Sequence, residues 1–339
     1  MQDVNPPPFN ARTRVHEYGG GAYCVVDGRV YFTHFADQRL YRSEPGLSPA
    51  ALTPDAGQSA LRYADFRADR RRDRLIAVRE DHRDSGREPR NELVAISLET
   101  PSPEGGRVLV SGRDFYSTPR VSPDGTRLAW LCWDHPNMPW DGTELWVAEL
   151  AEDGAVVNAR RVAGGPSESI VQPEWSPACV LHFVSDRSGW WNLYRCGVEP
   201  RAVGKVGPRS AGRNEPGGRM GEPEPLTLLD AEFATPQWVF GLSTYGFAPD
   251  GTLICSYTQN GLSRLAAMGP RERQLRPIAM PFTDLGGLRV GDGFAVFVAG
   301  SPTEAAVVAR LDLRNGAVER LRTSSAVEID AGYLSAPEA

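Results

Sequence analysis

A turn sequence recurs between apolar strands along this chain and leaves few folds open to it. Its clearest copies are Ser122-Pro123-Asp124-Gly125 and Ala248-Pro249-Asp250-Gly251, and Ser176-Pro177 begins a shorter copy. Proline presets φ at about −65° in the first central position of such a turn, and glycine accepts a positive φ without steric cost. Each copy therefore predicts a tight turn that joins two strands.

The segments around these turns predict short strands in repeated units. Leu128 to Trp133 alternates in a way that gives a strand one strongly apolar face. Turn positions 67, 122, 176 and 248 lie 55, 54 and 72 residues apart. Repeats of this size with about four short strands each are typical of propeller blades. We count six such units and no convincing amphipathic helix, so the sequence predicts an all-β propeller of about six four-stranded blades.

The longest interval between turns contains a stretch, about 203–222, that is rich in Gly, Pro and Arg. Such a composition does not pack, so we expect a flexible surface insertion there. The rest of residues 1–335 is predicted to form a single propeller domain.

Composition excludes several classes of protein. A hydrophobic share of 41% argues against global disorder, and a net charge of −6 argues against a general nucleic-acid binder. No uncharged apolar run reaches the ~18 residues that a membrane span requires. The five cysteines show no C-x-x-C spacing, which favours buried thiols in a reducing compartment. We therefore expect a cytoplasmic protein without nucleic-acid or membrane partners.

Motifs for catalysis, metals or cofactors are absent from the sequence. No G-x-S-x-G elbow occurs, because the near matches at Ser48, Ser59, Ser243 and Ser263 lack the closing glycine. The histidines lack metal-ligand spacing, so His34 and His182 in particular are expected to be structural. The run Gly19-Gly20-Gly21 predicts a close approach of two backbones rather than a phosphate cradle. We therefore expect no catalytic residue, no metal and no cofactor in this chain.

Five strings outside the repeats share their order with one known family. This chain resembles the amino-terminal propeller of the prolyl oligopeptidase family of serine peptidases, in its dipeptidyl-aminopeptidase and acylaminoacyl-peptidase-like branch. The resemblance covers essentially the whole chain. The strings are Arg12-Thr13-Arg14-Val15-His16-Glu17-Tyr18-Gly19-Gly20-Gly21-Ala22-Tyr23, Asp134-His135-Pro136-Asn137-Met138-Pro139-Trp140-Asp141, Ser185-Asp186-Arg187-Ser188-Gly189-Trp190-Trp191-Asn192-Leu193-Tyr194, Pro236-Gln237-Trp238-Val239-Phe240-Gly241 and Cys255-Ser256-Tyr257-Thr258-Gln259-Asn260-Gly261.

This resemblance implies a partner domain. Family members pair the propeller with a carboxy-terminal α/β-hydrolase domain that carries Ser, Asp and His. Residues 333–339 resemble the segment that crosses into that domain, and we place the start of the crossover itself at 336–339. In family members, about one further blade normally precedes the string that matches residues 12–23. The resemblance therefore implies a fragment of a two-domain chain or a propeller served by a second polypeptide. It also implies that six blades are present where seven would close the ring, so we expect an open ring. Exposed apolar blade faces at the opening would favour oligomers.

The resemblance further implies where substrate would lie. In the family the propeller restricts access to short peptides and holds the amino terminus of the substrate, and residues just before each innermost strand face the channel mouth. A carboxylate there pairs with a peptide ammonium, and an arginine with a carbonyl or carboxylate. The candidates are Arg14, His16, Glu17, Phe115, Tyr116, Glu168, Glu232 and Phe233.

Structural alternatives remain open at two of these places. Arg14 and Glu17 would brace a blade if they paired with each other. Trp190 and Trp191 would fill the space between blades, or else form a platform on which substrate stacks.

Two functions are compatible with this sequence. The leading interpretation is a non-catalytic propeller that gates and orients short peptides for an α/β-hydrolase domain. The other is a stand-alone interaction propeller similar to TolB, which shares the Ser-Pro-Asp-Gly turns. A sugar-acting propeller is disfavoured, because sialidase Asp-boxes need a residue between Asp and Gly whereas Asp124 and Gly125 are adjacent.

Overall fold

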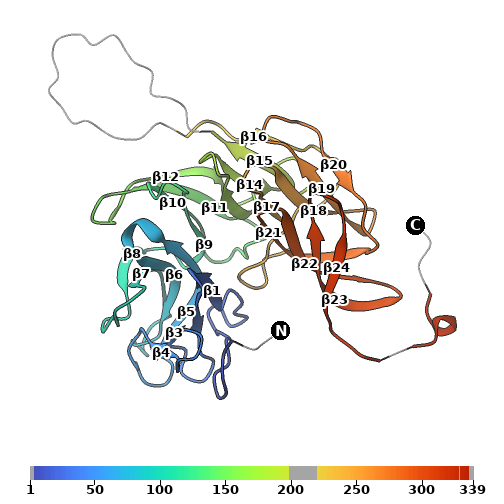
Figure 1. Cartoon of the computed structure of the whole chain (residues 1–339). Helices are drawn as coiled ribbons and strands as arrows, with labels where there is room; N and C mark the ends of the chain where they lie inside the picture. Colours follow the sequence, from blue (N-terminus) through green and yellow to red (C-terminus); the bar gives the residue numbers. More distant parts are fainter. Residues whose placement is uncertain (1–3, 198–219, 328, 336–339) are drawn as a thin grey trace, which may run out of the picture.

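The computed structural model describes residues 4–197, 220–327 and 329–335. The predicted crossover at 336–339 and most of the predicted insertion at 203–222 lie outside these residues. The described chain forms six four-stranded sheets, numbered blades 1 to 6 in chain order (Figure 1). This confirms the predicted all-β propeller.

The strands of each blade are antiparallel and follow one another in sequence order. Those of blades 1 to 3 are β1 (Tyr23–Val26), β2 (Arg29–Thr33), β3 (Leu40–Ser43), β4 (Ala50–Ala51), β5 (Leu61–Asp69), β6 (Arg74–Asp81), β7 (Arg90–Ser97), β8 (Arg107–Val110), β9 (Phe115–Val121), β10 (Arg127–Trp133), β11 (Glu144–Leu150) and β12 (Val156–Gly164). Those of blades 4 to 6 are β13 (Ile170–Trp175), β14 (Leu181–Ser185), β15 (Asn192–Cys196), β16 (Glu224–Pro225), β17 (Tyr245–Phe247), β18 (Leu253–Gln259), β19 (Leu262–Met268), β20 (Arg276–Ile278), β21 (Asp284–Gly291), β22 (Phe294–Ser301), β23 (Glu304–Asp312) and β24 (Val318–Thr323).

Helical structure in the described ranges is limited to two 3-10 turns, Arg70–Arg72 and Ala331–Tyr333. Neither is long and apolar enough to cross a membrane.

The recurring turns join the first and second strands of their blades, as predicted. In blade 3, Gly125 has a φ of +69°, the backbone N–H of Arg127 donates to Ser122 Oγ over 2.9 Å, and that of Thr126 donates to Asp124 Oδ1 over 3.1 Å. Gly251 occupies the same place in blade 5 with a φ of +86°. In blade 4 it is Cys179 that takes the positive φ, at +58°. The turn therefore keeps its geometry in blade 4, where its sequence pattern is weakest.

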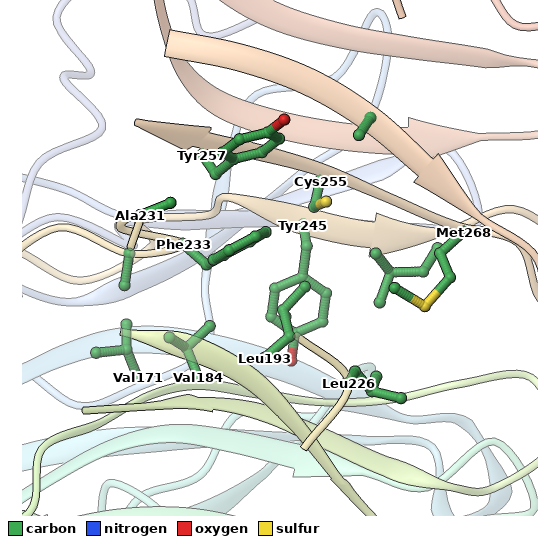
Figure 2. Close-up of a cluster of buried hydrophobic side chains, with 13 residues drawn as sticks. Val171, Val184, Leu193, Leu226, Ala231, Phe233, Tyr245, Cys255, Tyr257 and Met268 are labelled. Atoms are coloured by element: carbon green, nitrogen blue, oxygen red, sulfur yellow. The ribbon is translucent and has the colours of Figure 1, made fainter. Parts of the chain in front are cut away.

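Five hydrophobic clusters hold neighbouring blades together. They join blade 1 to 2, 2 to 3, 3 to 4, 4 to 5 and 5 to 6. Figure 2 shows the fourth of these, where Val171, Val184 and Leu193 of blade 4 face Tyr245 and Met268 of blade 5. No cluster of described residues joins blade 6 to blade 1, and Figure 1 shows these blades at the two ends of the series. The ring is therefore open.

The outward faces of the two end blades are incompletely covered. On blade 1, Phe9 packs against Phe32 and Tyr41 with ring centroids 5.9 and 5.1 Å away, whereas Tyr23 and Val25 are 63% and 59% exposed. On blade 6, Val298 is 48% exposed. Apolar side chains of both end blades thus face solvent at the opening.

The first strand of every blade lines a central channel. A cavity of about 840 Å³ is bordered by residues of β1, β5, β9, β13, β17 and β21. Since all strands of a blade are antiparallel, each first strand begins on the face of the propeller where each fourth strand ends. The chain that follows β24 therefore starts from that face, which we call the entry face.

Candidate functional site

Loops on the entry face surround a cavity of about 800 Å³. Its walls are formed by blades 1, 2, 3 and 5. They consist of the segments where the first strand of a blade begins and of the turns that join a second strand to a third. The contributing segments are residues 16–19 before β1, 80–82 and 88–92 around the β6–β7 turn, 111–117 at the start of β9, 133–140 after β10 and 237–240 before β17.

Two distant segments meet at one edge of this cavity because glycines allow it. The backbone N–H of Phe240 donates to Gly19 O over 2.8 Å, and Gly20 forms a parallel bridge with Phe240. A Cβ at Gly20 would lie 2.4 Å from the Phe240 carbonyl oxygen, and one at Gly21 would lie 2.9 Å from the Phe240 Cβ. The predicted close backbone approach at Gly19–Gly21 is confirmed, and it brings blade 5 against blade 1.

Aromatic rings form one wall of the cavity. His16 lies between Phe240, Phe115 and Trp133, with ring centroids 4.8, 5.1 and 5.6 Å away. Phe115 and Trp133 stack on one another at 5.4 Å. Flat aromatic surfaces of this kind hold another ring by offset or edge-to-face contact.

A second aromatic group lies toward the rim. The Trp140 and Trp238 rings are 4.3 Å apart, and Tyr18 meets Trp238 at 5.7 Å. Tyr18 and Trp238 are 64% and 52% exposed. Exposed aromatic side chains beside a cavity favour contact with a ligand or with another protein surface.

Carboxylates lie beside these rings. Glu80 is buried, and it accepts the backbone N–H of His16 at 3.3 Å while pairing with Arg62 at 3.2 Å and lying 2.8 Å from His82 Nε2. Glu17 is almost fully exposed and contacts the same Arg62 at 3.4 Å. Arg62 is thus shared by two carboxylates, which leaves this side of the cavity negative.

A further carboxylate lies on the blade 3 side. Asp114 Oδ2 accepts the backbone N–H of His135 at 3.0 Å and lies 3.0 Å from its Nδ1. These hydrogen bonds, first from the His135 backbone and then from its ring, lower the pKa of Asp114. Asp114 therefore stays ionised at neutral pH and adds to the negative charge of the cavity.

His16 is neutral at physiological pH. Burial among the aromatic rings lowers its pKa to about 4, although a hydrogen bond with Asn91 partly opposes this. The ring therefore acts as an uncharged wall of the cavity.

The structure brings three of the eight predicted site residues to this cavity, namely His16, Glu17 and Phe115. The next residue, Tyr116, points the other way because side chains alternate along a strand, and it is fully buried in the core between blades 2 and 3. Phe233 is also buried and stacks on Tyr257 at 4.9 Å.

The other three predicted residues lie outside the cavity lining. Glu168 is bound by Arg187 and by Ser185 Oγ at 2.8 and 2.7 Å within blade 4. Glu232 accepts the backbone N–H of Trp191 at 3.0 Å. These carboxylates fix loops of the fold.

The third of these residues is Arg14. It does not pair with Glu17, so the alternative in which these two residues brace a blade is wrong. The Arg14 guanidinium carbon lies 4.5 Å from the centroid of Phe35, whereas Glu17 contacts Arg62. At the tryptophan pair, Trp191 packs against the cluster between blades 4 and 5, while Trp190 is 41% exposed.

Sequence reasoning missed most of the cavity wall, including Glu80, Trp133, His135, Trp140, Trp238 and Phe240. A signal was present. Three of the five strings that carry the family resemblance, at 12–23, 134–141 and 236–241, contribute to this one cavity. Strings that match a family outside the repeats, and that come from different blades, indicate a shared site.

Within the described ranges, no group of three or more His, Cys, Asp or Glu residues is arranged to hold a metal ion. In the same ranges no serine hydroxyl is hydrogen-bonded to a histidine ring. Ser243, one of the near matches to a nucleophile elbow, donates its hydroxyl to Leu288 O over 2.7 Å.

Solved structures of puromycin-hydrolysing peptidases are similar to this chain at more than 30% identity. A puromycin-hydrolysing peptidase of Mycobacterium tuberculosis is 35% identical over 99% of this chain, with a TM-score of 0.86. Puromycin hydrolase is 33% identical over 96% of this chain, with a TM-score of 0.82. The chain covers 50% and 49% of these two proteins and so spans about half their length. Neither a protein-family model nor a curated protein matches the sequence.

More distant structures share the fold. Prolyl oligopeptidase B from Galerina marginata is 13% identical over 92% of this chain and 51% of its own, with a TM-score of 0.53. TolB from Acinetobacter baumannii is 13% identical over 93% of this chain and 64% of its own, with a TM-score of 0.50. The fold, the ordered strings and the similarity to the puromycin-hydrolysing peptidases agree, and the chain belongs to the β-propellers of the prolyl oligopeptidase family of peptidases.

Proposed function

We propose that this propeller holds the amino-terminal end of a short peptide or aminoacyl amide while an α/β-hydrolase domain, joined in cis or supplied in trans, cleaves it. The observation that carries this proposal is the cavity of about 800 Å³ on the entry face, which combines aromatic walls with carboxylates. A hydrolase domain that follows β24 in the same chain would start from this face. The propeller would then gate access to that domain and orient the substrate.

The chemistry of the cavity matches such a substrate. An aromatic side chain of the substrate would pack against Phe115 and the rings around it. Its ammonium group would be attracted by Glu17 and Glu80, which share a single arginine. Puromycin, the compound after which both similar peptidases are named, is an aminoacyl amide with an aromatic side chain and a free amino group.

The proposal is tested by titrating the purified chain with puromycin and with N-acetylpuromycin while following tryptophan fluorescence. Because acetylation removes the positive charge, we expect binding of the acetylated compound to be about tenfold weaker. Trp238→Ala should weaken puromycin binding about fivefold. Trp190→Ala is the matched control, since Trp190 has similar exposure (41% against 52%) but does not line the cavity. Equal affinity for both compounds, or equal effects of both variants, would refute the proposal.

A stand-alone interaction propeller similar to TolB is the second candidate. The fold similarity to TolB and the exposed aromatic rim at Tyr18 and Trp238 favour it. The same titration separates the two functions, because an interaction module has no reason to bind either small compound. Failure of both compounds to bind at millimolar concentration would favour this second function.

We place this activity in the cytoplasm. All five cysteines are free, and three of them are buried. Unpaired buried thiols are typical of proteins in reducing compartments.

A further inference from the structure

The central channel carries a group of charged side chains that the proposed function does not use. Five charged residues line its cavity of about 840 Å³, and they come from four of the innermost strands. They are Asp65 and Arg67 on β5, Arg120 on β9, Glu174 on β13 and Arg289 on β21.

Both carboxylates of this group are already engaged. Glu174 accepts from Arg67 Nη2 at 2.8 Å and from Arg120 Nε at 2.9 Å. Asp65 lies 3.4 Å from Arg120 Nη1 and accepts the backbone N–H of Thr118 at 2.6 Å. Two arginines are thus neutralised by two carboxylates.

Arg289 has no such partner. Its Nη1 and Nη2 donate to the carbonyl oxygens of Leu288 and Gly241 over 3.0 and 2.7 Å, and no carboxylate of the described residues pairs with it. Partial burial in the channel, followed by the nearby Arg120 charge, lowers the pKa of Arg289. The channel therefore holds three guanidinium groups against two carboxylates, which leaves one uncompensated positive charge in a chain whose net charge is −6.

The same sign of charge continues toward the face opposite the entry face. A neighbouring cavity of about 560 Å³ is lined by Arg67, Arg70 and Arg71, with Asp124 as its one acidic lining residue. Arg70 pairs with Asp27, whereas Arg71 makes no ion pair with any described carboxylate. Low-dielectric walls focus such a field along a cleft and raise the local concentration of anions.

We propose that the central channel binds a carboxylate, such as the carboxy-terminal group of a short peptide, through the guanidinium of Arg289. A guanidinium presents two parallel N–H donors that match the two oxygens of a carboxylate. One uncompensated charge matches a singly charged carboxylate, whereas a doubly charged phosphate would leave the channel negative. Arg289 does not line the aromatic cavity, although Phe240 borders both cavities, and this proposal does not depend on the proposed function.

The test is calorimetric titration of the full 339-residue chain with N-acetyl-dialanine, with its carboxy-terminal amide and with inorganic phosphate. The acetyl group removes the positive charge at the amino terminus of the dipeptide. The carboxylates of the aromatic cavity therefore do not attract this ligand. We expect the free carboxylate to bind at least tenfold more tightly than the amide and more tightly than phosphate. Arg289→Gln should abolish the difference between carboxylate and amide.

Arg276→Gln is the matched control, because Arg276 is exposed on β20 and pairs with Glu272 outside the channel. It should bind as the unmodified chain does. Arg289→Lys keeps the charge without the two-donor geometry and should weaken carboxylate binding severalfold, which keeps the test decisive if the glutamine variant does not fold. Absence of saturable carboxylate binding, equal binding of carboxylate and amide, tighter binding of phosphate, or an unchanged Arg289→Lys affinity would each overturn the proposal.

Discussion

Arg120 and Glu174 meet across the boundary between blades 3 and 4, where Arg120 Nε donates to Glu174 Oε2 over 2.9 Å. Arg120 is buried and also reaches Asp65 on blade 2. One guanidinium thus connects the innermost strands of three consecutive blades. Removing one partner of a buried ion pair leaves the other charge without compensation, which costs more than the pair itself contributes.

Arg120→Met should lower the free energy of unfolding by about 3 kcal/mol, because the buried Asp65 and the partly buried Glu174 would be left with less positive charge nearby. Urea unfolding measures the loss. Arg310→Met is the control, since the Arg310–Glu319 pair lies at 3.7 Å on the surface and should contribute less than about 1 kcal/mol. Similar losses in both variants would show that the network contributes no more than a surface pair.

Gly20→Ala should destabilise the protein more than Gly28→Ala does. Both glycines have a positive φ, +87° and +79°, so both substitutions impose about 1–2 kcal/mol of backbone strain. Only at Gly20 would the new Cβ meet another backbone, 2.4 Å from Phe240 O, whereas nothing lies within 4 Å at Gly28. Thermal unfolding should therefore show the larger fall for Gly20→Ala, together with weaker puromycin binding. Equal effects would mean that the Gly20–Phe240 bridge is not needed for the cavity.

Stability should decrease as the pH falls below about 6.5, in part because of His182. Burial between blades 4 and 5 lowers its pKa to about 4, while the unfolded chain protonates near its ordinary value of 6.5. Between these values the unfolded state binds more protons, so the contribution of the neutral ring is complete above about 6.5 and is lost toward pH 4, by up to about 3 kcal/mol.

His182→Gln tests this dependence. At pH 8 the difference from the unmodified chain reports packing alone, including the contact with Phe247 at 4.7 Å and the hydrogen bond to Val180 O at 3.0 Å. That difference should shrink between pH 8 and pH 5 in urea unfolding. A difference that does not change with pH would contradict the assignment.

The purified chain alone should hydrolyse neither aminoacyl nor acylaminoacyl arylamides. In triad enzymes, loss of the nucleophile and its base leaves only the contributions of the oxyanion hole and of binding. Release of arylamine, with and without a serine-directed phosphonate, measures this. Phosphonate-sensitive turnover that stays with the chain through two orthogonal columns would mean that one of Ser48, Ser59, Ser243 or Ser263 is a nucleophile.

The uncovered faces at the opening should cause the chain to associate at micromolar concentration. Val298→Asp should shift sedimentation toward the monomer, because a charge on the blade 6 face disfavours its burial. Val108→Asp is the control, since Val108 has similar exposure (44% against 48%) but lies on blade 2. A monodisperse monomer of the unmodified chain would refute the prediction.

The repeated turns were sufficient to predict the blades, because proline, aspartate and glycine fix a local geometry that needs no distant contact. Blade 4 shows the limit of this reasoning, since Cys179 takes the place of the glycine and no propensity rule would select it. The number of blades was still predicted correctly, because spacing carried the signal.

The cavity could be predicted only in part, because its residues meet through contacts between distant segments. Phe115 and Tyr116 are adjacent, yet one lines the cavity and the other is core, and only the register of β9 decides which. Phe240 reaches the cavity through its bridge with Gly20, a pairing between blades 1 and 5 that no periodicity encodes.

Six blades joined by five interfaces form an arc with two free ends, and this has a mechanical consequence. In a closed ring the rotations between neighbouring units must sum to a full turn, so a change at one boundary is cancelled at the others. In this arc no hydrophobic cluster of the described residues between blades 6 and 1 imposes that sum, and the Gly20–Phe240 bridge ties the segment before blade 1 to the segment before blade 5. Small rotations at the five clusters therefore add together toward the opening as far as that bridge allows. The bore of the channel is therefore set by the packing between blades together with this bridge, and we expect a substitution in one of the clusters to change the width of the opening.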